Sequence, residues 1–503
     1  MKTKYFLGID LGTSSVKVIA TTSENKIIGE VSREYPIYYP HEKWAEQAPE
    51  DWWAKTLGAI TDLLKLHQIP PDSIAAIGFS GQMHGLVALD KDNQVLFPAI
   101  LWCDQRTEEE CKEITGSFGL DKLREYTGNK ALAGFTAPKL LWVKKNRPEQ
   151  FRKIAHILLP KDYLRFKLTG DFATDVSDAS GTLMFDVKNR CWSKPMCDYL
   201  ELRKEQLPQV YESFEVTGKV SQDIKKRLGL TGEILVVGGA GDQAAGAIGT
   251  GTVEEGVISV TLGTSGVVFA AHQDYVVDSS CRLHAFCHAN GRYHSMGVML
   301  SAASCLKWWA EDIQAGTDIG TLLNEANEIG SSRGLIFLPY LLGERTPYPD
   351  PDAKGCFLGM DANTKRGNMT FAILEGVAFG LRDSLEILKD LNIPLKHVRV
   401  IGGGAKSVLW IQILANIFGM DIEEINTNEG GALGAAILAA VGAGSYKTVD
   451  EGCKSMIHVV NSISPINEKL NYYNNLYPKY QSAYQSLCNW YKPESHSVEG
   501  DLR

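Results

Sequence analysis

Two short glycine turns with the same sequence stand about half a chain length apart. Residues 6–18 read FLGIDLGTSSVKV and residues 257–269 read VISVTLGTSGVVF, so in each case an apolar run, the tetrapeptide LGTS and a second apolar run follow one another. This pattern predicts a strand hairpin. Glycine, serine and threonine allow such a turn to point backbone N–H groups at a phosphate. The repeat therefore predicts two hairpins that could grip one polyphosphate, each opening one half of the chain.

Asp10 is the last polar residue of the first predicted strand and stands directly before the first turn. A carboxylate at this place would repel nucleotide phosphates unless a cation lay between them. We therefore expect Asp10 to organise Mg²⁺ through water. A turn-capping aspartate is the structural alternative.

Asp242 lies in the glycine-rich segment 236–249, VVGGAGDQAAGAIG, which follows a predicted strand. Gly239, Gly241 and Ala244 match a loose dinucleotide-binding pattern. In that arrangement Asp242 would face the pyrophosphate, and no later strand ends in an acidic ribose contact. The segment instead favours Asp242 as a general base at the start of a helix, facing a substrate hydroxyl. A simple helix cap is the other interpretation.

Length and composition limit the class of protein. A chain of 503 residues is too long for one hydrophobic core, so we expect two domains. The net charge of −9 argues against a nucleic-acid partner. No apolar run is long enough to span a membrane, and the first residues do not resemble a leader, so no membrane partner is expected. The 10 cysteines form no CxxC pair, which fits a cytoplasmic location.

Strand and helix patterns alternate in both halves. Residues 75–79 and 398–401 read as buried strands, and residues 50–66 and 368–391 carry apolar residues at helical spacing. Residues 430–440 form a helix of small residues that can pack closely on a sheet or a ligand. This alternation predicts an α/β architecture with a mixed sheet in each domain and a substrate site in an interdomain cleft.

Two longer segments resemble the signatures of the FGGY family of carbohydrate kinases. They are residues 134–146, GFTAPKLLWVKKN, and residues 355–375, GCFLGMDANTKRGNMTFAILE. The resemblance implies a two-domain fold like that of actin, hexokinase and Hsp70, which is ribonuclease H-like. It also implies an N-terminal domain at 1–253, a C-terminal domain at 254–445, an extension with a polar tail at 446–503, and a possible homodimer. The chain has no P-loop, protein-kinase or nucleophile-elbow motif.

The resemblance also implies roles for single residues. Residues 78–90, GFSGQMHGLVALD, are similar to the branch of the family that acts on D-xylulose. Asp242 and Asp10 match catalytic residues. The residues that match sugar contacts are Gln82, Met83, His84, Asp242 and Gln243. The residues that match ATP contacts are Gly12, Thr13, Ser14, Gly263, Thr264, Ser265, Gly402, Gly403, Ala405, Lys406, Asn416 and Gly431. Many members have asparagine after the catalytic aspartate, whereas the longer amide of Gln243 could reach a different hydroxyl.

The reaction implied is ATP- and Mg²⁺-dependent phosphorylation of D-xylulose to D-xylulose 5-phosphate in pentose catabolism. Ribulose, gluconate and glycerol are alternative acceptors within the family. Two hypotheses from other classes stay open at this point. One is an ATP-binding protein of the actin or Hsp70 type, and the other is a sensor that binds sugar and ATP without turnover.

Overall fold

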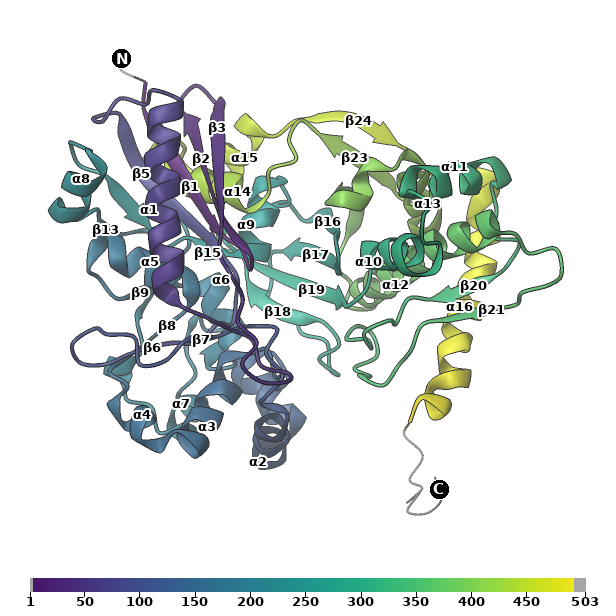
Figure 1. Ribbon diagram of the computed structural model, residues 1–503, viewed down its shortest axis with the longest axis horizontal. Coiled ribbons are helices and arrows are strands. Elements are labelled where there is room, and N and C mark those ends of the chain that lie inside the picture. Colours follow the sequence, from purple (N-terminus) through teal and green to yellow (C-terminus); the bar gives the residue numbers. More distant parts are fainter. Residues whose placement is uncertain (1–2, 493–503) are drawn as a thin grey trace. The chain divides into compact units, whose positions relative to one another are not determined.

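The computed structural model describes residues 3–492 (Figure 1). The chain folds into two compact units, and three segments contribute to each. The first unit comprises Met1–Glu255, Ala271–Ser295 and Ile425–His458, and the second comprises Gly256–Ala270, Met296–Glu424 and Val459–Arg503. The domain limits 1–253, 254–445 and 446–503 stay a prediction, and the polar tail expected at 493–503 lies outside the described residues. No helix within residues 3–492 has the length and apolar character needed to cross a membrane.

A mixed sheet of seven strands forms the centre of the first unit. Its order is β13-β14-β5-β1-β2-β3, and β15 also pairs with β5. The strands are β1 (Tyr5–Leu11), β2 (Ser15–Thr22), β3 (Ile27–Glu34), β5 (Ile74–Gly81), β13 (Val216–Lys219), β14 (Leu235–Val237) and β15 (Ala240–Gly241). Strand β1 pairs antiparallel with β2 and parallel with β5. The first LGTS segment is therefore the predicted hairpin.

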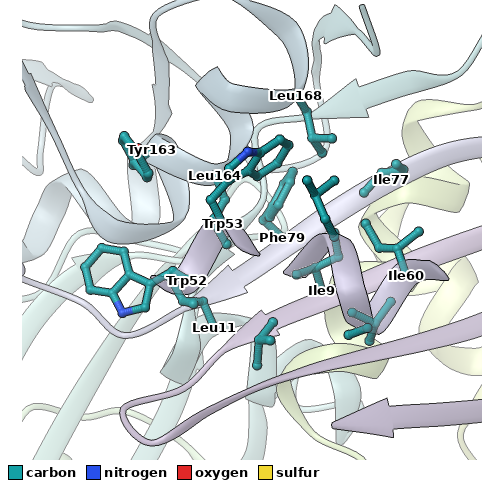
Figure 2. Packing of buried hydrophobic residues seen from close by; sticks show 14 of the residues in the cluster. Ile9, Leu11, Trp52, Trp53, Ile60, Ile77, Phe79, Tyr163, Leu164 and Leu168 are labelled. Atoms are coloured by element: carbon teal, nitrogen blue, oxygen red, sulfur yellow. The ribbon is translucent and has the colours of Figure 1, made fainter. Parts of the chain in front are cut away.

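Alternation along β1 divides its side chains between two helices. Successive side chains of a strand point to opposite faces of the sheet. Ile9 and Leu11 join the core cluster that contains Trp52 and Ile60 of helix α1 (Pro49–Leu66), as Figure 2 shows. Asp10 belongs to the alternate set of residues, whose face is covered by helix α14 (Gly431–Gly442). The strand that anchors the core thus also presents the carboxylate.

Helix α14 lies almost on the backbone of the sheet because its residues are small. A Cβ atom added at Gly8 would lie 1.9 Å from the carbonyl oxygen of Ala432, and one added at Gly78 would lie 2.1 Å from that of Ala435. These distances are far shorter than atomic contact allows, so only glycine fits at both strand positions. The close packing expected of the small-residue helix is confirmed.

The second unit repeats the strand pattern of the first. Strand β16 (Gly256–Leu262) pairs antiparallel with β17 (Gly266–His272) and parallel with β22 (Leu395–Ile401). These strands belong to a seven-stranded sheet with the order β18-β19-β17-β16-β22-β23-β24. Its remaining strands are β19 (Tyr293–Met299), β23 (Asp421–Ile425) and β24 (Val459–Ile463), together with β18 (His284–Cys287), whose residues count with the first unit. The predicted α/β class with a mixed sheet in each half is confirmed.

Helices complete the second unit. The amphipathic helix predicted at 368–391 is α12, which spans Arg366–Asp390 and is buried along most of its length. It packs against α11, α13 and α16. The helices are α10 (Ala303–Trp308), α11 (Ile319–Ile329), α13 (Val408–Phe418) and α16 (Asn467–Tyr491). The first unit also contains α2 (Glu108–Thr127), α3 (Thr136–Asn146), α5 (Pro160–Thr169), α6 (Val176–Ala179), α8 (Gln222–Leu228), α9 (Asp242–Gly249) and α15 (Val449–Met456).

Candidate active site

The first unit brings three strand ends to one edge of its sheet. Asp10 of β1 lies opposite Ser80 of β5, and Gly241 of β15 lies opposite Gly81 of β5. All three strands run parallel there, so their carboxyl ends coincide, which is where α/β sheets usually bind ligands. Asp10 stands at the end of β1, Gln82 directly after β5 and Asp242 directly after β15. The predicted residues Asp10, Gln82 and Asp242 therefore lie at the ends of three neighbouring strands.

Burial makes the Asp10 carboxyl harder to ionise. Desolvation raises its pKa, while a hydrogen bond from Ser80 Oγ to Oδ1 at 2.7 Å and the charge of Lys17 lower it. Lys17 itself is paired with Glu429 at 3.1 Å. Among residues 3–492, no three metal-ligating side chains gather at one place. Asp10 fits Mg²⁺ nonetheless, because this ion is commonly held by one or two carboxylates together with water and phosphate oxygens.

Asp242 has the properties of a general base. It is the first residue of α9, and desolvation together with the negative charge of Asp10 raises its pKa to about 7. The backbone and side chain of Gln243 hydrogen-bond to it and lower this pKa, so the shift is a net result. A carboxylate with a pKa near neutrality can take a proton from a hydroxyl at physiological pH. The Gln243 amide thus interacts with Asp242, and its expected sugar contact stays a prediction.

Gln82 and Met83 are buried next to these carboxylates. Gln82 is 1% exposed, and its Nε2 donates to Gln47 Oε1 at 3.0 Å. Its Oε1 has no hydrogen-bond partner among the described residues, which leaves an acceptor for a substrate hydroxyl. Met83 packs on Gly241, where an added Cβ would lie 2.9 Å from its Sδ. The pair therefore forms a wall directly beside the start of α9.

His84 is held in an unusual backbone conformation. Its φ is +68°, in the left-handed region that few residues other than glycine adopt. Its carbonyl oxygen accepts hydrogen bonds from Lys139 Nζ at 2.9 Å and from Thr136 Oγ1 at 3.1 Å. Its ring Nδ1 lies 2.6 Å from the carbonyl oxygen of Gly181, and the ring packs 4.7 Å from Phe135. Two separate chain segments, residues 135–139 and the turn at Gly181, thus fix this histidine.

The first hairpin turn, Gly12–Ser14, is braced through its carbonyl oxygens. Thr13 O accepts from Gln47 Nε2 at 2.7 Å, and Gly12 O accepts from Tyr35 Oη. Trp102 Nε1 also donates to Thr13 Oγ1 at 3.0 Å. Carbonyl groups would repel a phosphate, so their pairing with protein donors suits anion binding at this turn. Gln47 was not predicted from the sequence, although it links the hairpin to Gln82.

The second hairpin turn, Gly263–Ser265, repeats this arrangement within the second unit. Gly263 O accepts from Ala303 N at 2.7 Å, and Thr264 O accepts from Ala302 N at 2.9 Å and from Ser304 Oγ at 2.7 Å. The same element, the start of α10, supplies all three donors. In both turns, therefore, protein donors pair with the carbonyl oxygens of the glycine and the threonine.

A cavity of about 420 Å³ opens beside the second turn. This volume lies in the range of small-molecule sites. Of the predicted ATP contacts, Thr264, Gly403 and Lys406 line it. The lining residues that sequence reasoning missed are Ala303, Ser304, Leu306, Lys307, Glu311, Ile319, Leu323, Gly404, Ser407 and Trp410. Apolar walls with a few polar groups suit a flat base and its ribose.

Four other predicted ATP contacts are chain neighbours of this lining, whereas Asn416, Gly431 and the first turn, Gly12–Ser14, are not among the lining residues. Gly263, Ser265, Gly402 and Ala405 adjoin lining residues in the chain. Gly402 has a φ of +98°, and an added Cβ would lie 2.7 Å from Leu262 O, so this turn requires glycine. Asn416 is 5% exposed and its Oδ1 accepts from Ile466 N at 2.8 Å. Gly431 lies in the first unit, where an added Cβ would lie 2.8 Å from Asp10 Oδ2.

Comparisons with known proteins agree on one family. The model of the N-terminal domain of the FGGY family of carbohydrate kinases matches residues 5–249, and that of the C-terminal domain matches residues 258–443. The chain is 42% identical to the xylulose kinase of Escherichia coli over 89% of this chain and 92% of that one, and 38% identical to that of Bacillus subtilis over 96% and 97%.

A solved structure agrees with these matches. The crystal structure described as a xyloylose kinase from Brucella ovis superposes with a TM-score of 0.92, at 38% identity and over 97% of this chain and 100% of that one. Two family models that together cover most of the chain, and relatives of this similarity over nearly its full length, leave one conclusion: the chain belongs to the FGGY family of carbohydrate kinases.

Proposed function

We propose that the protein transfers the γ-phosphoryl group of ATP to O5 of D-xylulose and releases D-xylulose 5-phosphate and ADP, in pentose catabolism. The observation that carries this proposal is the Asp242 carboxyl, with its pKa of about 7, at a strand edge walled by Met83 and Gln82. A kinase for a sugar hydroxyl needs such a base, whereas a protein that only binds ATP does not. Relatives described as xylulose kinases support this sugar over ribulose, gluconate or glycerol.

The proposed reaction is a direct displacement. The O5 oxygen attacks the γ-phosphorus, the new P–O bond forms, and the bond from the γ-phosphorus to the β–γ bridging oxygen breaks so that ADP leaves. The proton of O5 passes to a carboxylate oxygen of Asp242. The two hairpin turns bind phosphate oxygens through backbone N–H groups, and Gln82 and His84 orient the sugar. Mg²⁺, held by Asp10 through water, would neutralise phosphate charge when bound.

The test measures ADP release with MgATP and a panel of acceptors. The panel contains D-xylulose, D-ribulose, L-ribulose, L-xylulose, gluconate and glycerol. We expect the highest kcat/KM with D-xylulose, and a loss of at least about 100-fold in Asp242→Ala, which is the range for removal of a general base. Turnover of another acceptor in preference would overturn the choice of sugar, and no turnover with any acceptor would favour the sensor. A cytoplasmic location and a homodimer stay predictions, and sedimentation would test the dimer.

A further inference from the structure

In the first unit, a buried lysine lies among three buried carboxyl groups. Lys161, in the first turn of α5, has a fully buried side chain. Its Nζ lies 2.6 Å from Asp162 Oδ1, 2.8 Å from Asp175 Oδ1 and 3.5 Å from Asp178 Oδ2. All three acids are fully buried as well. Such a cluster is costly to desolvate, which indicates a role other than general stability.

A chain of hydrogen bonds leads from this cluster to the catalytic segment. Asp175 Oδ2 accepts from Ser177 N at 2.8 Å, from Ser177 Oγ at 2.6 Å and from Ser213 Oγ at 2.7 Å. Ser177 Oγ in turn accepts from the backbone N–H of Gly241 at 3.1 Å. Gly241 immediately precedes Asp242 and caps α9. Two hydrogen bonds, both made by Ser177 Oγ, therefore connect the Asp175 carboxylate of the ion pair to the backbone N–H of the residue that precedes the base.

The catalytic segment needs an external support because of its own sequence. Gly238, Gly239, Ala240 and Gly241 precede Asp242, and Gly239 has a φ of +76°. A run so rich in glycine has many accessible conformations of similar energy. A general base, however, must be held within a few tenths of an ångström of its working position. The N–H of Gly241 is the last backbone donor before Asp242, and Ser177 binds it.

We propose that Lys161, Asp175 and Ser177 are positioning residues for phosphoryl transfer, which fix the Gly241 peptide and thereby hold Asp242 against the acceptor hydroxyl. Lys161 neutralises and orients the Asp175 carboxylate. Asp175 orients the Ser177 hydroxyl so that its oxygen faces Gly241. The inference rests on the proposed function, since it requires Asp242 to act as the base.

Two serines allow a matched test. Ser177→Ala and Ser213→Ala each remove one fully buried hydroxyl from the same oxygen of Asp175, but only Ser177 also binds Gly241. We expect Ser177→Ala to lower kcat at least about tenfold while KM for D-xylulose and for MgATP changes less than about threefold. Ser213→Ala should keep kcat within about threefold. Equal losses of kcat in the two variants would overturn the proposal.

Hydrogen exchange gives a second readout that needs no turnover. The amide protons of residues 239–243 should exchange at least about tenfold faster in Ser177→Ala than in Ser213→Ala or the unmodified protein. If the unmodified protein turns over no acceptor, the proposed function fails while this exchange result still reports on the support of Gly241. Unchanged exchange, or faster exchange with unchanged kcat, would overturn the inference. Should Ser177→Ala not fold, Ser177→Cys keeps a weaker acceptor at the same place and should show the same pattern in smaller degree.

Discussion

The Asp242 carboxyl should set the pH range of activity. Burial and the charge of Asp10 raise its pKa to about 7, and only the ionised form can accept the proton of a hydroxyl. We therefore expect kcat/KM for D-xylulose to fall about tenfold for each pH unit below 7 and to level off above it. Rates from pH 5.5 to 8.5 with saturating MgATP would check this, with circular dichroism to exclude unfolding. A profile that stays flat down to pH 5.5 would contradict the role of Asp242 as the base.

The support of His84 should be visible in the affinity for sugar. Thr136 Oγ1 and Lys139 Nζ both donate to the His84 carbonyl oxygen, which stabilises its left-handed backbone. Thr136→Val removes one donor and keeps the shape of the side chain, and a lost hydrogen bond costs about 1 kcal/mol. We expect KM for D-xylulose to rise about fivefold and KM for MgATP to stay unchanged. Thr136→Ser keeps the donor and should behave like the unmodified protein. A parallel rise of both KM values would show a general disturbance instead.

The sequence indicated some of these residues and missed others for a physical reason. Asp10 could be found because it stands at the end of an apolar run, and Asp242 because it follows a glycine-rich turn after one, and strand ends are where ligands bind. Lys139 and Lys161 act through carbonyl and carboxyl groups that the fold brings close from distant parts of the chain, and spacing along the chain does not encode such contacts. The only signal of Lys161 was a charged residue inside an apolar stretch, LLPKDYL, and Lys139 lies in the segment 134–146 that resembles a family signature but received no role of its own.

At the scale of elements, hydrogen bonds between buried groups attach α16 to α12. Tyr473 Oη donates to Glu375 Oε1 at 2.9 Å, and both residues are 2% exposed. Burial raises the pKa of Glu375 from 4.5 to about 7. Between these values the folded state holds a proton that the unfolded state has lost, so stability falls as pH rises from about 4.5 to about 7.

Glu375→Gln should remove this pH dependence. The amide still accepts from Tyr473 and never ionises, so the variant should match the unmodified protein near pH 5 and be more stable near pH 8, by at most about 3 kcal/mol. Glu386→Gln is the control. It makes the same change on the same helix, but Lys389 and Arg382 lower the pKa of Glu386, so this variant should lose stability at pH 8. Thermal melts at pH 5 and pH 8 would measure the stability of both variants. The same change of melting temperature in Glu375→Gln and Glu386→Gln would contradict the raised pKa of Glu375.

The elements differ in how far their sequence determined them. The LGTS hairpins and the long helix α12 follow from local patterns, because turn residues and helical spacing act over a few residues. The partners of α14 did not follow, since the glycines at 8 and 78 become complementary to it only once the helix lies on the sheet, and Gly434 only once the helix lies on α9. Small residues indicated close packing but not the surface on which it occurs.

At the scale of the whole molecule, the segment that completes the first unit comes from late in the chain. Helix α14 lies on β1 and β5 and against α9, and its residues Ala432, Leu433, Ala436 and Ile437 belong to a buried core cluster of that unit. A chain that ends at residue 255 lacks this helix and would expose the glycine-lined face of the sheet. The boundary at 253 suggested by the family resemblance stays a prediction, and the compact first unit also includes residues 271–295 and 425–458.

Fragments should reveal this dependence. We expect residues 1–255 alone to melt without a cooperative transition and to bind a hydrophobic dye, because an apolar face stays in water. Joining residues 425–458 to this fragment through a flexible glycine and serine linker of about 20 residues should restore a cooperative transition. The control is the same linked chain with Gly434→Val, since any Cβ at that position would lie 1.9 Å from the carbonyl oxygen of Ala245. A fragment 1–255 that melts as cooperatively as the linked chain would show that the sheet and its first helices suffice, and α14 would then be a late addition to a unit already folded.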